Sequence, residues 1–152
     1  MADKKFYVLP DLPYTYNALE PYISETQLKI HHDKHHAAYV KGANTILEKL
    51  DKAHQDGTDL DMKATLKELS FNIGGHILHS LFWKNMMPAN KASKEPSGAI
   101  ADVLKKEFGS FDRFKKDFSA AATSAEGSGW GALAYCRQTN RPLIMQIEKH
   151  SV

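Results

Sequence analysis

Residues 24–50 read SETQLKIHHDKHHAAYVKGANTILEKL, and this stretch decides the fold. It begins with Ser24 and Gln27 in the S-x-x-Q order of a capping box, in which side chains satisfy the first free amides of a helix. The stretch therefore predicts one long helix from Ser24 to about Leu50.

An apolar stripe runs along this helix when its residues are projected at about 100° per residue. His35 and Tyr39 fall on the stripe and His31 lies on its flank, so these side chains are expected to face the interior. The aliphatic members of the stripe are Leu28, Ile46 and Leu50. His36 falls off the stripe together with Lys34 and Lys41, and we expect these three to point toward solvent or a partner.

A second helix is predicted over about Met62 to Met86, where the sequence is apolar nearly all round, as in a buried helix. One polar and aromatic face interrupts it, formed by Asn72, His76, His79 and Trp83. Packed antiparallel to the first helix, this face would bring His79 close to His31. Gly74-Gly75 in mid-helix costs about 1 kcal/mol per glycine relative to alanine, which predicts close approach of another helix or of a metal site.

The histidines are clustered. Six of the eight lie in His31-His32-Asp33-Lys34-His35-His36 and His76-Ile77-Leu78-His79. Neutral imidazole is the commonest protein ligand for first-row transition metals, so the clustering predicts a metal site. A single helical histidine is more often a packing or surface residue, and we expect His32, His36, His54 and His76 not to be ligands.

The remainder of the chain changes character after Met86. A breaker-rich linker reaches Gly98, two helices are predicted over 98–108 and 111–125, and two strands over 130–137 and 142–147 form a hairpin. The predicted fold class is α+β. An N-terminal antiparallel helical hairpin domain occupies residues 1–88, and an α/β domain with an antiparallel sheet occupies residues 89–152.

Composition excludes several classes of protein. With 42% hydrophobic and 25% charged residues the chain is typical of a soluble globular protein, and a net charge of +2 with interspersed signs argues against nucleic-acid binding. No apolar run is long enough to span a membrane, and no hydrophobic stretch follows Met1–Lys5, so a cytoplasmic location is expected. The lone Cys136 is expected to be a core-packing residue.

Four motifs in order resemble the iron/manganese superoxide dismutases. They are Leu12-Pro13-Tyr14, Ile30-His31-His32-Asp33-Lys34-His35-His36-Ala37-Ala38-Tyr39-Val40, Gly74-Gly75-His76-Ile77-Leu78-His79-Ser80-Leu81-Phe82-Trp83 and Gly127-Ser128-Gly129-Trp130-Gly131. The resemblance covers essentially the whole chain. It implies an N-terminal helical hairpin and a C-terminal α/β domain with a three-stranded antiparallel sheet.

The resemblance also implies a metal site made of three histidines, one aspartate and a solvent molecule. His31 and His79 match two of the ligands, whereas the other two belong to an Asp-x-Trp-x-His motif that does not occur before Val152. Tyr39 and His35 match residues that flank the substrate channel and relay protons. His150 stands where manganese members usually have a glutamine that hydrogen-bonds the bound solvent, and a histidine there favours iron over manganese. Trp83 and Trp130 match aromatic walls of the site.

The implied function is dismutation of superoxide to dioxygen and hydrogen peroxide at a mononuclear Fe or Mn site, by an enzyme that forms a homodimer or homotetramer. An alternative is a non-catalytic truncated fragment, or an interaction module, that binds divalent metal weakly through its histidines. Two histidines alone would favour copper or zinc by the Irving–Williams order. Continuation of the reading frame past Val152 into the Asp-x-Trp-x-His motif would favour the enzyme.

Overall fold

A computed structural model describes residues 6–150, so the expectation about Met1–Lys5 lies outside the described residues. The chain divides into two compact units, the first ending at Ala92 and the second beginning at Ser93. Helices make up the first unit, and two helices with a strand pair make up the second. The predicted α+β class, with a helical hairpin followed by an α/β domain, is confirmed. Among the described residues, no helix is long and apolar enough to cross a membrane.

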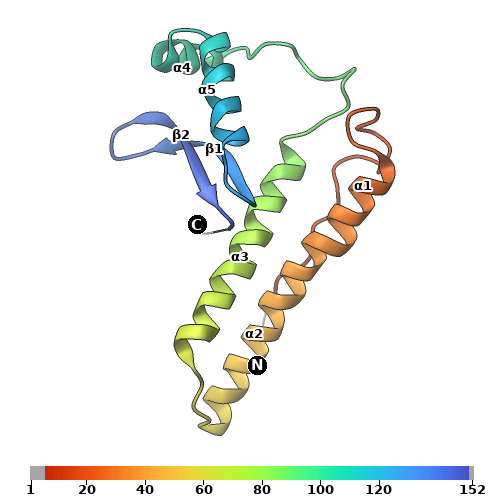
Figure 1. The fold of residues 1–152 in the computed structure, drawn as a ribbon, viewed down its shortest axis with the longest axis vertical. Coiled ribbons are helices and arrows are strands. Elements are labelled where there is room, and N and C mark those ends of the chain that lie inside the picture. The colour runs from red at the N-terminus through yellow and green to blue at the C-terminus, as the bar shows by residue number, and fades with distance from the viewer. Residues whose placement is uncertain (1–5, 151–152) are drawn as a thin grey trace. The chain divides into compact units, whose positions relative to one another are not determined.

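Three helical segments follow one another without a break: α1 (Glu25–Lys29), η1 (Ile30–His36) and α2 (Ala37–Asp56) (Figure 1). The predicted start is confirmed, because the Ser24 side chain accepts a hydrogen bond from the Gln27 amide at 3.2 Å. The helix continues beyond Leu50 and ends at Gly57, whose φ of 67° is the left-handed conformation that glycine adopts without strain.

The segment η1 is a π-helix, which the periodicity did not predict. Its backbone hydrogen bonds join residues five apart, so the residue five positions after His31 returns to the same side of the helix. That residue is His36, whose side chain is fully buried, and the prediction that it points toward solvent is wrong. Lys34 and Lys41 are exposed, as expected.

Helix α3 (Met62–Lys84) runs antiparallel to α2 and packs along it (Figure 1). The Asp61 side chain begins it by accepting a hydrogen bond from the Ala64 amide at 3.0 Å. The close approach of another helix that the glycine pair predicts is seen at Gly75. A Cβ there would lie 2.7 Å from ring carbons of Tyr39 on α2. The expectation that α3 is buried all round is wrong, because one set of its apolar side chains is exposed: Met62, Leu66, Phe71, Ile77 and Leu81.

The core of the first unit lies beside the ends of α1 and α3. Leu19, Leu28 and Trp83 are its fully packed members, and side chains of the N-terminal segment cover them. That segment is also tied to α2 by a reciprocal pair of hydrogen bonds. The Tyr7 amide donates to Asn44 Oδ1 at 2.9 Å, and Asn44 Nδ2 donates to the Tyr7 carbonyl at 2.8 Å.

The second unit contains α4 (Ala99–Phe108), α5 (Phe111–Thr123), β1 (Gly129–Cys136) and β2 (Arg141–Glu148). The strands pair antiparallel, as predicted, in a register from Gly129 opposite Glu148 to Cys136 opposite Arg141. Helix α5 packs tightly on β1, because a Cβ at Gly131 would lie 3.0 Å from the Ala122 side chain. Cys136 is only partly buried, at the hairpin end of β1, so the expectation of a core residue is wrong.

Candidate metal centre

Two histidines from different helices meet in the first unit. His31 on η1 and His79 on α3 are 48 positions apart in sequence, yet their Nε2 atoms lie 3.1 Å from each other. The two rings are nearly perpendicular, with centroids 5.0 Å apart. The prediction that antiparallel packing brings His31 near His79 is therefore confirmed.

The orientation of His79 is fixed by its own helix. Its Nδ1–H donates to the Gly75 carbonyl at 2.7 Å, one turn earlier in α3. A neutral imidazole carries one proton, so this bond makes Nε2 an acceptor whose lone pair is directed toward His31 Nε2. An N–H to carbonyl bond of this kind is the usual support of a metal-binding histidine.

His35 joins the pair, one turn after His31. One ring nitrogen from each of His31, His35 and His79 lies within 4.8 Å of the others, and this is the one such group of three within residues 6–150. Tyr39 follows on α2, with its ring 4.9 Å from His35 and 5.3 Å from His79. Burial raises the pKa of the Tyr39 phenol, so it keeps its proton at neutral pH.

The residues present fit a first-row transition metal. Two nitrogen ligands at about 2.1 Å from one ion, at right angles, would lie about 3 Å apart, close to the spacing of the two Nε2 atoms. Burial first, and then the charge of nearby His35, lowers the pKa of His31, which keeps that ring in the neutral form that can bind metal. His31, His35 and His79 could hold such an ion, and imidazole suits iron among several metals.

A second layer of side chains surrounds these rings, and the sequence reasoning missed it. Trp83 Nε1 donates to His36 Nδ1 at 2.9 Å, and His36 Nε2 lies 2.9 Å from His76 Nδ1. His36 was expected at the surface. The sequence did contain a signal for the inward position of His36. His35 and His36 follow His31 by four and five residues, and both can lie on the same face as His31 only where the helix widens into a π-turn.

His150 belongs to the second unit. Its Nδ1 accepts a hydrogen bond from Trp130 Nε1 at 3.1 Å, which joins the segment after β2 to the start of β1. His31, His35, Tyr39 and His79 thus lie together in the first unit, while His150 and Trp130 lie together in the second. The roles expected for these residues remain predictions.

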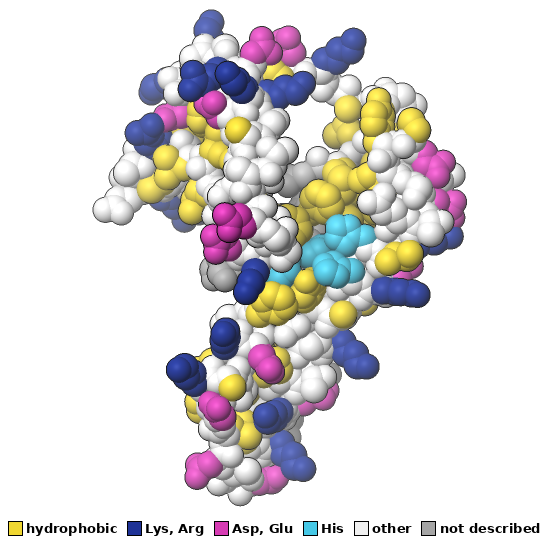
Figure 2. All heavy atoms as spheres, in the orientation of Figure 1, with side chains coloured by type: hydrophobic (Ala, Val, Ile, Leu, Met, Phe, Trp, Pro, Cys, Tyr) yellow, Lys and Arg dark blue, Asp and Glu magenta, His cyan; other side chains and the backbone are white. Residues whose placement is uncertain are grey.

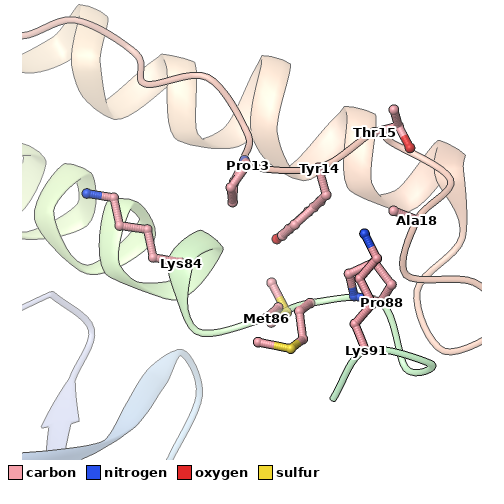
Figure 3. A pocket seen from close by; sticks show the side chains of 9 residues that line it. Pro13, Tyr14, Thr15, Ala18, Lys84, Met86, Pro88 and Lys91 are labelled. Atoms are coloured by element: carbon pink, nitrogen blue, oxygen red, sulfur yellow. The ribbon is translucent and has the colours of Figure 1, made fainter. Parts of the chain in front are cut away.

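Solvent reaches the histidines through a pocket of about 570 Å³ that Ser24, Gln27, Ile30, His31 and His35 line. Figure 2 shows histidine side chains gathered at the surface of the helical unit, bordered by hydrophobic side chains. A pocket of similar volume lies elsewhere in the first unit, between Tyr14, Lys84, Met86 and Lys91 (Figure 3). No histidine lines this second pocket, so it is separate from the candidate metal site.

Comparison with known proteins agrees with this arrangement. The sequence profile of the iron/manganese superoxide dismutase alpha-hairpin domain matches residues 6–87, and that of the C-terminal domain matches residues 96–152. The superoxide dismutase [Fe] of Methanothermobacter marburgensis is 62% identical over 150 residues, which are 99% of this chain and 74% of that protein.

Two further relatives come from other organisms. The superoxide dismutase [Fe] of Pyrobaculum aerophilum is 52% identical over the whole chain, which spans 72% of that protein. The superoxide dismutase [Mn/Fe] of Aeropyrum pernix is 51% identical, again over the whole chain and 71% of the relative. With both family domains matched and this identity along its entire length, the chain belongs to the iron/manganese superoxide dismutases.

Proposed function

We propose that this chain converts superoxide to dioxygen and hydrogen peroxide at a mononuclear iron or manganese centre that includes His31 and His79. The observation that carries the proposal is the 3.1 Å approach of their Nε2 atoms, with His79 oriented by the Gly75 carbonyl. Relatives named superoxide dismutase [Fe] or [Mn/Fe] support both metals. Two of these three relatives are named [Fe] and the third [Mn/Fe], which favours iron.

Dismutation consumes two superoxide anions and two protons and yields one dioxygen and one hydrogen peroxide. Bound iron or manganese would supply the one-electron oxidation and reduction. The protein's part is to hold the ion in a fixed position and to move the protons. His31 and His79 serve the first task through their Nε2 atoms.

Tyr39 and His35 serve the second task. Their rings contact each other at 4.9 Å, and His35 is exposed while Tyr39 is half-buried against His79. We assign His35 the uptake of a proton from solvent, and we assign its delivery to Tyr39, whose phenol stays protonated at neutral pH because burial raises its pKa. We assign His150 the role that its motif position implies, which is to tune the solvent bound to the metal, and Trp130 restrains its ring by donating from Nε1 to its Nδ1.

An opportunistic zinc or copper site is the second candidate function. The group of three that the described residues contain is all imidazole, without a carboxylate, and such a donor set binds copper and zinc more tightly than iron or manganese. On this alternative the histidines bind metal but no dismutation follows.

One experiment separates the two. Superoxide dismutation per mole of bound metal is measured for the chain reconstituted with Fe or Mn, alongside His31→Ala and His54→Ala, the latter an exposed histidine on α2. Activity that is lost in His31→Ala and kept in His54→Ala would support the enzyme. Binding of Zn²⁺ or Cu²⁺ without activity in any metal form would support the alternative.

We also assign the chain a cytoplasmic location and a homodimeric or homotetrameric state. Support for self-association comes from exposed apolar side chains of the helical unit, Ile30, Ile77 and Leu81 among them. Light scattering of the chain after size-exclusion chromatography tests the oligomeric state, and a monomer at micromolar concentration would contradict it.

A further inference from the structure

Behind the proposed ligands, three side chains form a continuous string of hydrogen bonds. Trp83 donates from Nε1 to His36 Nδ1, and His36 Nε2 lies 2.9 Å from His76 Nδ1. His36 is 0% exposed and Trp83 is 1% exposed, so water does not compete for these bonds. His76 is half-buried and contacts the Tyr7 ring edge-on at 5.2 Å.

The direction of the string is determined by its first member. An indole N–H can only donate, so Nδ1 of His36 must be unprotonated. His36 then carries its proton on Nε2 and donates it to Nδ1 of His76, which places the His76 proton on Nε2. Each imidazole in the string is thereby held in one tautomer.

The string contacts the rings of both proposed ligands. His36 stacks on His79 with centroids 5.3 Å apart and an interplanar angle of 25°. Trp83 meets His31 nearly perpendicularly, at 5.0 Å and 79°. Through these contacts one set of hydrogen bonds restrains a ring on η1 and a ring on α3.

Proton relay is a role that the string does not suit. Transfer along a chain of hydrogen bonds requires each member to accept one proton while it releases another, and the indole of Trp83 has no acceptor atom. The string therefore ends at a group that cannot take part. What remains for it is to hold rings in place, and the loss of such outer supports typically weakens metal binding by about 10–100-fold.

We propose that His36 is a positioning residue, held by Trp83 and His76, which sets the rings of His31 and His79 in their metal-binding orientation before the metal arrives. The inference rests on the proposed function, because it takes His31 and His79 as the ligands. It goes further by giving a role to a residue that offers no nitrogen to the metal.

Two substitutions test the two hydrogen bonds of His36 one at a time. In His36→Asn the side-chain oxygen stands two bonds beyond Cβ, as Nδ1 does, so it can still accept from Trp83. In His36→Gln the amide reaches toward His76 and leaves the Trp83 N–H without its acceptor. His54→Asn, on the exposed face of α2, is the matched control. Circular dichroism and thermal unfolding establish that each variant is folded.

The first measurement needs no metal. A long-range ¹H–¹⁵N correlation spectrum of the chain reports which nitrogen of each imidazole is protonated. We expect Nε2–H for His36 and His76 in the wild type, and a mixture of tautomers for His36 in Trp83→Phe, where the donor is gone. A proton on Nδ1 of His36 in the wild type would overturn the proposal.

The second measurement is the affinity for Mn²⁺ alone, read from the electron paramagnetic resonance signal of the free ion. We expect His36→Gln to bind Mn²⁺ at least tenfold more weakly than the wild type, His36→Asn to lose less affinity because it keeps the Trp83 bond, and His54→Asn to stay within about threefold of the wild type. A folded His36→Gln with unchanged affinity would overturn the positioning role while leaving the metal site intact. Equal binding by wild type and His31→Ala would instead overturn the proposed site, and the ligand-orienting role with it.

Discussion

His79 donates its Nδ1 proton to the carbonyl oxygen of Gly75, 2.7 Å away and one turn earlier in the same helix. Gly75 itself has no side chain, and the space that a Cβ would take is filled by the Tyr39 ring of the neighbouring helix. One glycine thus supports the proposed ligand and admits the proposed proton donor.

Gly75→Ala should destabilise the fold. The new Cβ would lie 2.7 Å from the Tyr39 ring, so one helix must shift or the ring must leave its rotamer, at a cost of about 1–3 kcal/mol in the free energy of unfolding. Urea unfolding measures the change. Adding Tyr39→Ala removes the clash, so the glycine substitution should cost less in that background; an equal cost in both backgrounds would contradict the proposed cause.

Removal of either proposed ligand should abolish specific metal binding. We expect His31→Ala and His79→Ala to bind Mn²⁺ or Fe²⁺ at least 100-fold more weakly, because the two Nε2 atoms act on one ion. Equilibrium dialysis with metal analysis measures the affinity, and His54→Ala should match the wild type. Retention of wild-type affinity in His79→Ala would count against the shared site.

Stability should fall in mildly acidic solution. Burial above all lowers the pKa of His36 to about 3, whereas the unfolded value is about 6.5. Below pH 6.5 His36 therefore binds a proton in the unfolded chain but not in the folded chain. This group lowers the free energy of unfolding by up to about 1.4 kcal/mol for each unit that the pH falls. Urea unfolding of the metal-free chain between pH 7 and pH 5 measures the slope.

The matched variant for this effect is His36→Leu. It lacks the titrating group, so the free energy of unfolding should depend less steeply on pH over the same range, although the variant is less stable at pH 7. The lowered pKa values of His31 and His76 act in the same direction and leave a residual slope. Equal slopes in wild type and variant would show that His36 is not the group responsible.

Tyr39 should resist ionisation. Burial raises the pKa of its phenol above the usual value of about 10, so tyrosinate absorbance from this residue should appear late in an alkaline titration. The difference between wild type and Tyr39→Phe isolates its contribution. If that difference develops at or below pH 10, Tyr39 is more hydrated than its contacts with His79 and Phe71 indicate.

Asn44→Ala should loosen the N-terminal segment. The side chain pairs with both backbone groups of Tyr7, and its removal leaves a partly buried N–H and C=O without these partners, which costs about 1–3 kcal/mol. Hydrogen exchange at the Tyr7 amide should accelerate. Asn17→Ala, in the exposed turn before α1, serves as the control with little change in stability.

Local sequence signals predicted most elements because they depend on neighbouring residues. Ser24, Gln27 and the breakers around Pro88 and Gly98 determine where helices begin or end through short-range hydrogen bonds and backbone preferences. The predicted closeness of His31 and His79 followed from placing two periodic helices antiparallel. The glycine pair predicted a close approach at Gly75. The sequence did not show that the Tyr39 ring makes that approach.

The sequence by itself determined the helical hairpin, the strand pair and the two histidine clusters, since periodicity and motif order are properties of the linear chain. Only the tertiary structure decided where His36 points. His36 points inward from a single π-helical segment. There its side chain hydrogen-bonds with Trp83 and His76, which lie 47 and 40 positions away in the sequence. The local spacing of the histidines can indicate the π-turn, but contacts at such separation in sequence are decided by packing.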